Sequence, residues 1–194
     1  MAMTELEQHY NKFNEEKRLD SRHGRVEFIT SMKYIHNCLD DIKAAMDIAS
    51  DIKILDIGAG TGSVTVELAL HALYGTVYAV ERTEEGCSLI AKNAEKFGLN
   101  NIEIIHGNAA AVIDSLPVPD KVFIGGSGGE LEYIFSSILK KNPYVHIVVT
   151  AVTLETLNNT ISLMEKNGMN VLDIVQIAVT EVKKKGQISY DVCE

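Results

Sequence analysis

The sequence predicts an α/β protein, specifically a three-layer αβα sandwich around a mostly parallel, seven-stranded sheet. Short apolar runs alternate with segments of helix length from residue 53 onward. This alternation is typical of right-handed crossovers between parallel strands. The last two expected strands have no long helix between them, which indicates an antiparallel C-terminal hairpin.

The individual elements follow from hydrophobic periodicity and from glycines just beyond the ends of segments. Residues 31–49 repeat apolar side chains at helical spacing, so an amphipathic helix is expected before the first strand. Expected strands span residues 53–57, 76–80, 102–106, 121–125, 145–150, 171–180 and 187–192. Further helices are expected at residues 62–73, 83–97, 129–141 and 154–167. Residues 183–186, a lysine run followed by glycine, are expected to form the tip of the hairpin.

Length and composition are those of one globular domain. The 194 residues, 46% hydrophobic and 23% charged, can bury a substantial core. We expect an N-terminal arm at residues 1–29 and a single domain at residues 30–194. The net charge of −9 argues against broad nucleic-acid binding, which depends on clustered lysine and arginine.

No targeting segment or metal motif is evident in the sequence. No apolar run is long enough to span a bilayer, and residues 1–30 lack the apolar core of a secretory signal. Cys38, Cys87 and Cys193 lie far apart, without the spacing of metal ligands. We interpret them as reduced thiols of a cytoplasmic protein that has no metal site and no membrane contact.

A glycine-rich turn follows the first expected strand and carries the main chemical signal. Without a Cβ atom, glycine lets the backbone turn sharply and approach a ligand closely. The turn reads Gly58-Ala59-Gly60-Thr61-Gly62 and follows Asp56, so it differs from the Gly-x-Gly-x-x-Gly dinucleotide pattern. Asp56 would repel a pyrophosphate but can accommodate the ammonium group of S-adenosylmethionine, directly or through water. The sequence therefore predicts S-adenosylmethionine as the cofactor.

Two further strand ends support an adenosyl cofactor. Glu81 ends the second expected strand, where its carboxylate could accept both hydroxyls of a ribose. Arg82 follows it directly and is included among the cofactor-binding candidates. At the end of the third strand, Asn108 and Ala109 could meet the adenine ring, through a backbone amide or through the Asn108 side chain.

Several segments resemble the C15-methyltransferases of cobalamin biosynthesis, which belong to the class I methyltransferases. The segments are residues 55–63, 77–82, 149–156 and, most distinctively, 122–131 with its Gly-Gly-Ser-Gly-Gly-Glu-Leu stretch. The resemblance covers roughly residues 27–180. It implies a Rossmann-like class I methyltransferase fold acting on precorrin-6B or its cobalt form.

The resemblance also implies a reaction and a set of substrate contacts. The reaction is methyl transfer from S-adenosylmethionine to C15 of the tetrapyrrole, with decarboxylation of the acetate on C12. The second glycine run would let a macrocycle approach, and its amides could hold a carboxylate of the substrate. The implied substrate-binding residues are Gly125, Gly126, Ser127, Gly128, Gly129, Thr150 and Thr153. No catalytic side chain is expected, and the family implies a homotetramer.

The ends of the chain match the family less closely. Thr30 is the best match to a threonine that contacts the cofactor in the family, with Ser31 as an alternative and a helix N-cap as another function for either residue. Residues 141–144 and 181–186 depart from the family pattern. The lysines near the C-terminus could grip substrate carboxylates or lie at a solvated hairpin tip.

Two other functions are compatible with the cofactor signal alone. One is a class I methyltransferase that acts on tRNA or another macromolecule, which the acidic composition disfavours. The other is a non-catalytic S-adenosylmethionine-binding partner protein, which the altered C-terminal third would allow.

Overall fold

The structure is a computed structural model that describes residues 51–169, 174, 181–185 and 188–192. The chain divides into two compact units, one of Met46–Leu172 and one of Met1–Ala45 with Asp173–Glu194. In the second unit, β6 (Glu181–Lys185) and β7 (Ile188–Val192) pair in antiparallel fashion. The helix expected at residues 31–49 lies outside the described residues. None of the helices in the described ranges has the length and hydropathy needed to cross a bilayer.

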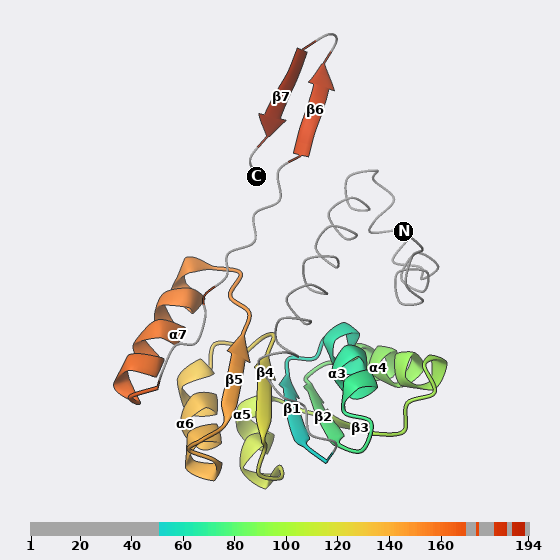
Figure 1. Cartoon of the computed structure of the whole chain (residues 1–194), viewed down its shortest axis with the longest axis vertical. Helices are drawn as coiled ribbons and strands as arrows, with labels where there is room; N and C mark the ends of the chain where they lie inside the picture. Colours follow the sequence, from blue (N-terminus) through green and yellow to red (C-terminus); the bar gives the residue numbers. More distant parts are fainter. Residues whose placement is uncertain (1–50, 170–173, 175–180, 186–187, 193–194) are drawn as a thin grey trace. The chain divides into compact units, whose positions relative to one another are not determined.

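The first unit alternates strands and helices in the predicted manner (Figure 1). Its elements in chain order are β1 (Lys53–Ile57), α3 (Ser63–His71), β2 (Thr76–Glu81), α4 (Glu84–Lys96), β3 (Ile102–His106), α5 (Ala109–Val112), the 3-10 helix η2 (Ile113–Ser115), β4 (Lys121–Ile124), α6 (Leu131–Lys141), β5 (His146–Val149) and α7 (Leu154–Lys166). The short α5 and η2 were not predicted from the sequence.

The five strands of this unit form one parallel sheet in the order β3-β2-β1-β4-β5 (Figure 1). β1 lies at the centre and pairs with β2 on one side and with β4 on the other. The chain first builds the sheet outward from β1 to β3 and then returns to β4 on the opposite side of β1. This reversal makes a topological switch point between β1 and β4, where ligands bind in open α/β sheets.

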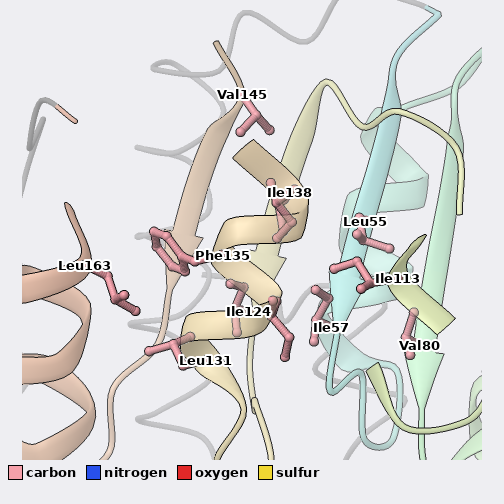
Figure 2. Packing of buried hydrophobic residues seen from close by; sticks show 12 residues of the cluster. Leu55, Ile57, Val80, Ile113, Ile124, Leu131, Phe135, Ile138, Val145 and Leu163 are labelled. Carbon is pink, nitrogen blue, oxygen red and sulfur yellow. The ribbon is translucent and has the colours of Figure 1, made fainter. Parts of the chain in front are cut away.

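Successive residues of β1 contribute to two different hydrophobic clusters, as expected for alternating side chains of a strand. Ile54 packs with residues of α3 and β2. Leu55 and Ile57 pack with residues of β4, η2, α6 and α7. Figure 2 shows the second cluster, in which Phe135 and Ile138 of α6 gather beside the strands. The sheet is therefore held in place from both sides of β1.

The five central strands agree with the sequence-based elements to within two residues at each end, but the C-terminal part differs. The predicted single seven-stranded sheet was not found: the described strands form a five-stranded parallel sheet and a separate two-stranded sheet. Most of the strand expected at residues 171–180 lies outside the described residues. The prediction that the lysine run forms the hairpin tip is wrong, because Lys183, Lys184 and Lys185 lie within β6. Lys185 pairs with Ile188, the first residue of β7.

Candidate functional site

The loops after β1 and β4 lie at the topological switch point and define the candidate site. In the loop after β1, Gly58, Gly60 and Gly62 have φ angles of 72°, 58° and 83°. These left-handed conformations are the ones that glycine adopts without steric cost. The backbone amides of Gly58 and Ala59 both donate to the carbonyl of Val80, at 3.0 and 3.1 Å. The loop is therefore tied to the end of the neighbouring strand β2.

The two glycine runs of the sequence contact each other directly. A Cβ atom on Gly58 would lie 2.5 Å from the carbonyl oxygen of Gly126 and 2.7 Å from its nitrogen. A Cβ atom on Gly125 would lie 3.2 Å from the carbonyl oxygen of Gly58. The amide of Gly125 also donates to the carbonyl of Ile57 at 2.9 Å. Glycine at these positions thus brings the loop after β1 against the loop after β4.

Asp56, two residues before Gly58, is fully buried beside this contact. The Thr65 hydroxyl donates to its Oδ2 at 2.5 Å, while Oδ1 has no hydrogen-bond partner among the described residues. Burial is the largest effect on the pKa of Asp56 and raises it, the bond from Thr65 lowers it, and the nearby Glu81 carboxylate raises it. The net result is a pKa of about 7 for Asp56. An unpaired buried oxygen is rare in proteins, and this one leaves capacity for a water molecule or a cationic group.

Glu81, at the end of β2, is held by donors on both sides of its carboxylate. The Gly60 amide donates to Oε2 at 2.9 Å, and Thr83 donates to Oε1 from its amide at 2.9 Å and from its hydroxyl at 2.7 Å. Burial acts to raise the pKa of Glu81, but the bonds from Thr83 and from the amides of Gly60 and Arg82 bring it below its usual range. Glu81 is therefore an anion at neutral pH, anchored next to the glycine loop.

The loop after β3 is linked to the end of the second glycine run. Asn108 caps α5, since its Oδ1 accepts from the amide of Ala110 at 2.8 Å, and its Nδ2 donates to Glu130 at 2.7 Å. The side chain of Asn108 is thus already committed, whereas the amide of Ala109 is in the first turn of a helix and has no intrahelical acceptor. Between the two options left by the sequence, this geometry favours the backbone amide for a contact with adenine.

The second glycine run has open space around most of its backbone. A Cβ atom on Gly126, Gly128 or Gly129 would meet nothing within 4 Å. Gly128 and Gly129 have left-handed φ angles of 61° and 91°. The carbonyl of Ser127 accepts from the amide of Glu130 at 3.1 Å, just before α6 begins. No described atom therefore blocks close approach of another group to the backbone of this run at these three glycines.

The loop after β5 lies beside the end of β4. The amide and the hydroxyl of Thr150 both point to the carbonyl of Ile124, at 3.0 and 3.3 Å. Thr153 is the N-cap of α7, because its hydroxyl accepts from the amide of Thr156 at 3.2 Å. Between and after these threonines, Val152 and Leu154 are 96% and 74% exposed. The loop thus presents two apolar side chains at the edge of the sheet that carries the glycine runs.

The remaining predicted residues are placed as follows. Arg82 is exposed, and its carbonyl lies 3.1 Å from His106 Nε2. Thr61 is exposed, and its carbonyl accepts from the side chain of Asn93 at 2.9 Å. Thr30 lies outside the described residues. In the part of the chain that the structure describes, no group of three His, Cys, Asp or Glu side chains could hold a metal ion.

Four residues that support the site were not found by sequence reasoning: Thr65, Thr83, Asn93 and Glu130. Only Thr83 carried a usable signal, because a threonine before an acidic first turn is typical of a helix N-cap. The others act across 9 to 32 residues of sequence, a separation that only the folded chain closes.

A known protein family and several individual proteins match this sequence. A family model described as the precorrin methyltransferase domain matches residues 43–190. The chain belongs to the precorrin methyltransferase family. It is 41% identical over 138 residues to a Saccharolobus solfataricus protein named "probable cobalt-precorrin-6B C(15)-methyltransferase (decarboxylating)", covering 68% of each chain. It is 32% identical over 138 residues to the Salmonella typhimurium protein of the same name without "probable", covering 71% of each chain.

A solved structure supports the assignment of the chain to this family. A Methanobacterium thermoautotrophicum structure titled precorrin 8w decarboxylase has a TM-score of 0.67 and 31% sequence identity, covering 81% of this chain and 83% of that one. The resemblance inferred from the glycine runs is thereby confirmed, as is the expected α/β Rossmann-like methyltransferase fold, whose parallel sheet has five described strands. The protein is an enzyme of the methyltransferase class.

Proposed function

We propose that this protein methylates C15 of precorrin-6B or cobalt-precorrin-6B, using S-adenosylmethionine, with decarboxylation of the acetate on C12. The observation that carries the proposal is the contact between the glycine loop after β1 and the glycine run after β4. One loop has the features of a cofactor site and the other leaves space for a macrocycle. The names of the relatives support the choice of substrate.

The cofactor residues fit an adenosyl group on chemical grounds. Glu81 makes the end of β2 negatively charged, and Asp56 Oδ1 is unpaired, which suits a cationic ligand rather than a pyrophosphate. When bound, S-adenosylmethionine supplies a methyl group on a positively charged sulfur. Because Asp56 is fully buried, we favour contact through water over direct contact with the ammonium group. The complete proposed set is Thr30, Asp56, Gly58, Ala59, Gly60, Thr61, Gly62, Glu81, Arg82, Asn108 and Ala109.

On the substrate side, the amides of residues 127–129 and the Ser127 hydroxyl would hold a carboxylate of the tetrapyrrole. The amides of Gly125 and Gly126 already donate to the carbonyl of Ile57, so these two glycines would contribute by letting the macrocycle approach closely. Thr150 remains a proposed contact, while Thr153 is used as a helix cap and would contribute chiefly through its position. The exposed Val152 and Leu154 add apolar surface, which suits the flat face of a macrocycle.

The chemistry asks little of the protein's side chains. The tetrapyrrole carbon is an electron-rich, enamine-like nucleophile, and the conjugated ring can take up the electrons released with carbon dioxide. The protein contributes by holding S-adenosylmethionine and the tetrapyrrole close together in a fixed orientation. This converts a bimolecular step into an effectively unimolecular one. The proposal therefore needs no catalytic acid or base, and the glycine contact sets the distance between the two binding loops.

Other expectations stay proposals beside this one. We propose a single domain at residues 30–194, in which the hydrophobic clusters on both sides of β1 support a three-layer arrangement. A cytoplasmic location and a homotetramer remain predictions from the cysteine pattern and the family resemblance. The family assignment does not favour a tRNA methyltransferase or a non-catalytic binding protein.

A labelling experiment tests the proposal. The full chain is mixed with cobalt-precorrin-6B and S-adenosylmethionine that carries a labelled methyl group, and labelled product and carbon dioxide are measured together. We expect both at a one-to-one ratio. Binding of S-adenosylhomocysteine without label transfer would overturn the enzymatic proposal, and label transfer to tRNA instead would replace the substrate.

A further inference from the structure

The Glu81 carboxylate is a junction between the glycine loop and helix α4. Its Oε2 accepts from the amide of Gly60 in the loop. Its Oε1 accepts both donors of Thr83, the residue that caps α4. The stem of Glu81 is confined as well, since a Cβ atom on Gly86 would lie 2.6 Å from Glu81 Cγ. The orientation of this carboxylate is thus set from three directions.

The Thr83 hydroxyl makes two hydrogen bonds with different partners. It donates to Glu81 Oε1 at 2.7 Å and accepts from the amide of Gly86 at 3.1 Å. The bond from the Gly86 amide is the one that a helix N-cap residue usually accepts. The first is not required for capping and connects the cap to the acid at the end of β2.

We propose that Thr83 is a positioning residue, which orients Glu81 to receive the ribose hydroxyls of the cofactor. This inference rests on the proposed function, in which Glu81 binds the ribose. The terminal torsion of a glutamate is soft, so a carboxylate without lateral bonds samples many orientations. Holding Oε1 at Thr83 keeps the carboxylate plane fixed before the ligand arrives, and preorganisation of this kind increases affinity.

Three substitutions at Thr83 separate positioning from capping. Thr83→Val removes the hydroxyl at nearly constant shape. Thr83→Gly also removes it but retains most N-cap stability, since glycine is tolerated at this position. Thr83→Ser keeps both hydrogen bonds and serves as the rescue variant. Binding to the full chain is measured by calorimetry for S-adenosylhomocysteine and for its analogue with a 2′,3′-dideoxyribose.

We expect Thr83→Val and Thr83→Gly to weaken S-adenosylhomocysteine about tenfold, the effect of one hydrogen bond to a charged group. The dideoxy analogue, which lacks the hydroxyls, should change by less than about twofold, and Thr83→Ser should bind both ligands like the wild type. Equal weakening of both ligands, or no weakening, would overturn the inference and leave Thr83 as a cap alone. If the wild type binds neither ligand, the cofactor half of the proposed function fails instead, and this inference fails with it.

Discussion

Replacing Gly58 with alanine tests whether the contact between the two glycine runs shapes the site. Alanine at a φ of 72° costs about 1 to 2 kcal/mol, the penalty of a left-handed conformation. The new methyl group would also lie 2.5 to 2.9 Å from three backbone atoms of Gly126. Backbone cannot rotate away as a side chain can, so about 1 to 3 kcal/mol of overpacking is added. We expect Gly58→Ala to lower the free energy of unfolding by about 2 to 5 kcal/mol in total.

Two other glycines provide matched controls for this prediction. Gly60 and Gly98 have φ angles of 58° and 64°, but a Cβ atom on Gly60 would meet only an atom 4.0 Å away and one on Gly98 nothing within 4 Å. Both should therefore lose only about 1 to 2 kcal/mol on substitution. The reduced entropy of the unfolded chain is common to all three variants and cancels in the comparison.

Urea denaturation measures the free energy of unfolding of the three variants. In a separate assay, the rate of methyl transfer from S-adenosylmethionine is measured under conditions where each variant is folded. Folded Gly58→Ala should lose about 100-fold in rate, because a shift of the order of 1 Å separates the two binding loops. Gly98→Ala should keep its rate. If Gly58→Ala and Gly98→Ala have the same stability and rate, the contact with Gly126 has no role and the reasoning is refuted.

Three further predictions concern the buried acid, the apolar loop and the core. Because burial raises the pKa of Asp56 from 3.8 to about 7, its contribution to stability is complete at low pH and is lost as the pH rises through 7. Urea denaturation should therefore show a smaller decline between pH 5 and 8 for Asp56→Asn than for the wild type, and equal declines would contradict the assignment. Joint substitution Val152→Ser and Leu154→Gln should raise KM for the tetrapyrrole about tenfold without changing affinity for S-adenosylhomocysteine. Tyr144→Ser, at a residue 91% exposed before the opposite end of β5, is the control that should change neither value. Phe135→Ala should cost about 3 to 5 kcal/mol of unfolding free energy, because this side chain is 1% exposed in the larger hydrophobic cluster, and a loss below about 1 kcal/mol would exclude that packing.

The central sheet could be predicted because each strand carries its own local signal. Residues 53–57 and 102–106 were expected as strands and are β1 and β3 with the same bounds. The helices at 83–97 and 154–167 were also expected, with ends at most one residue away from those observed. α5 was missed because four residues are too few for a helical period to appear in the sequence.

The C-terminal part was predicted less well, for a different reason. The lysine run at 183–186 was interpreted as a turn, yet β6 begins at Glu181 and contains Lys183, Lys184 and Lys185. The strand expected at 171–180 stays a prediction, because most of it lies outside the described residues. Strand register depends on the partner strand as much as on local pattern, so a charged segment can pair once β7 is available.

The sequence by itself determined the order of the five central strands and the longer helices and indicated an adenosyl cofactor, because hydrophobic period, glycine turns and acidic strand ends are properties of short segments. The sequence also indicated the family, through the Gly-Gly-Ser-Gly-Gly-Glu-Leu stretch. Tertiary structure alone decided that Gly58 lies against Gly126 and that Asn108 reaches Glu130. Those contacts depend on the order in which parallel strands assemble and on backbone approach within a few ångströms, and neither leaves a mark on the local sequence.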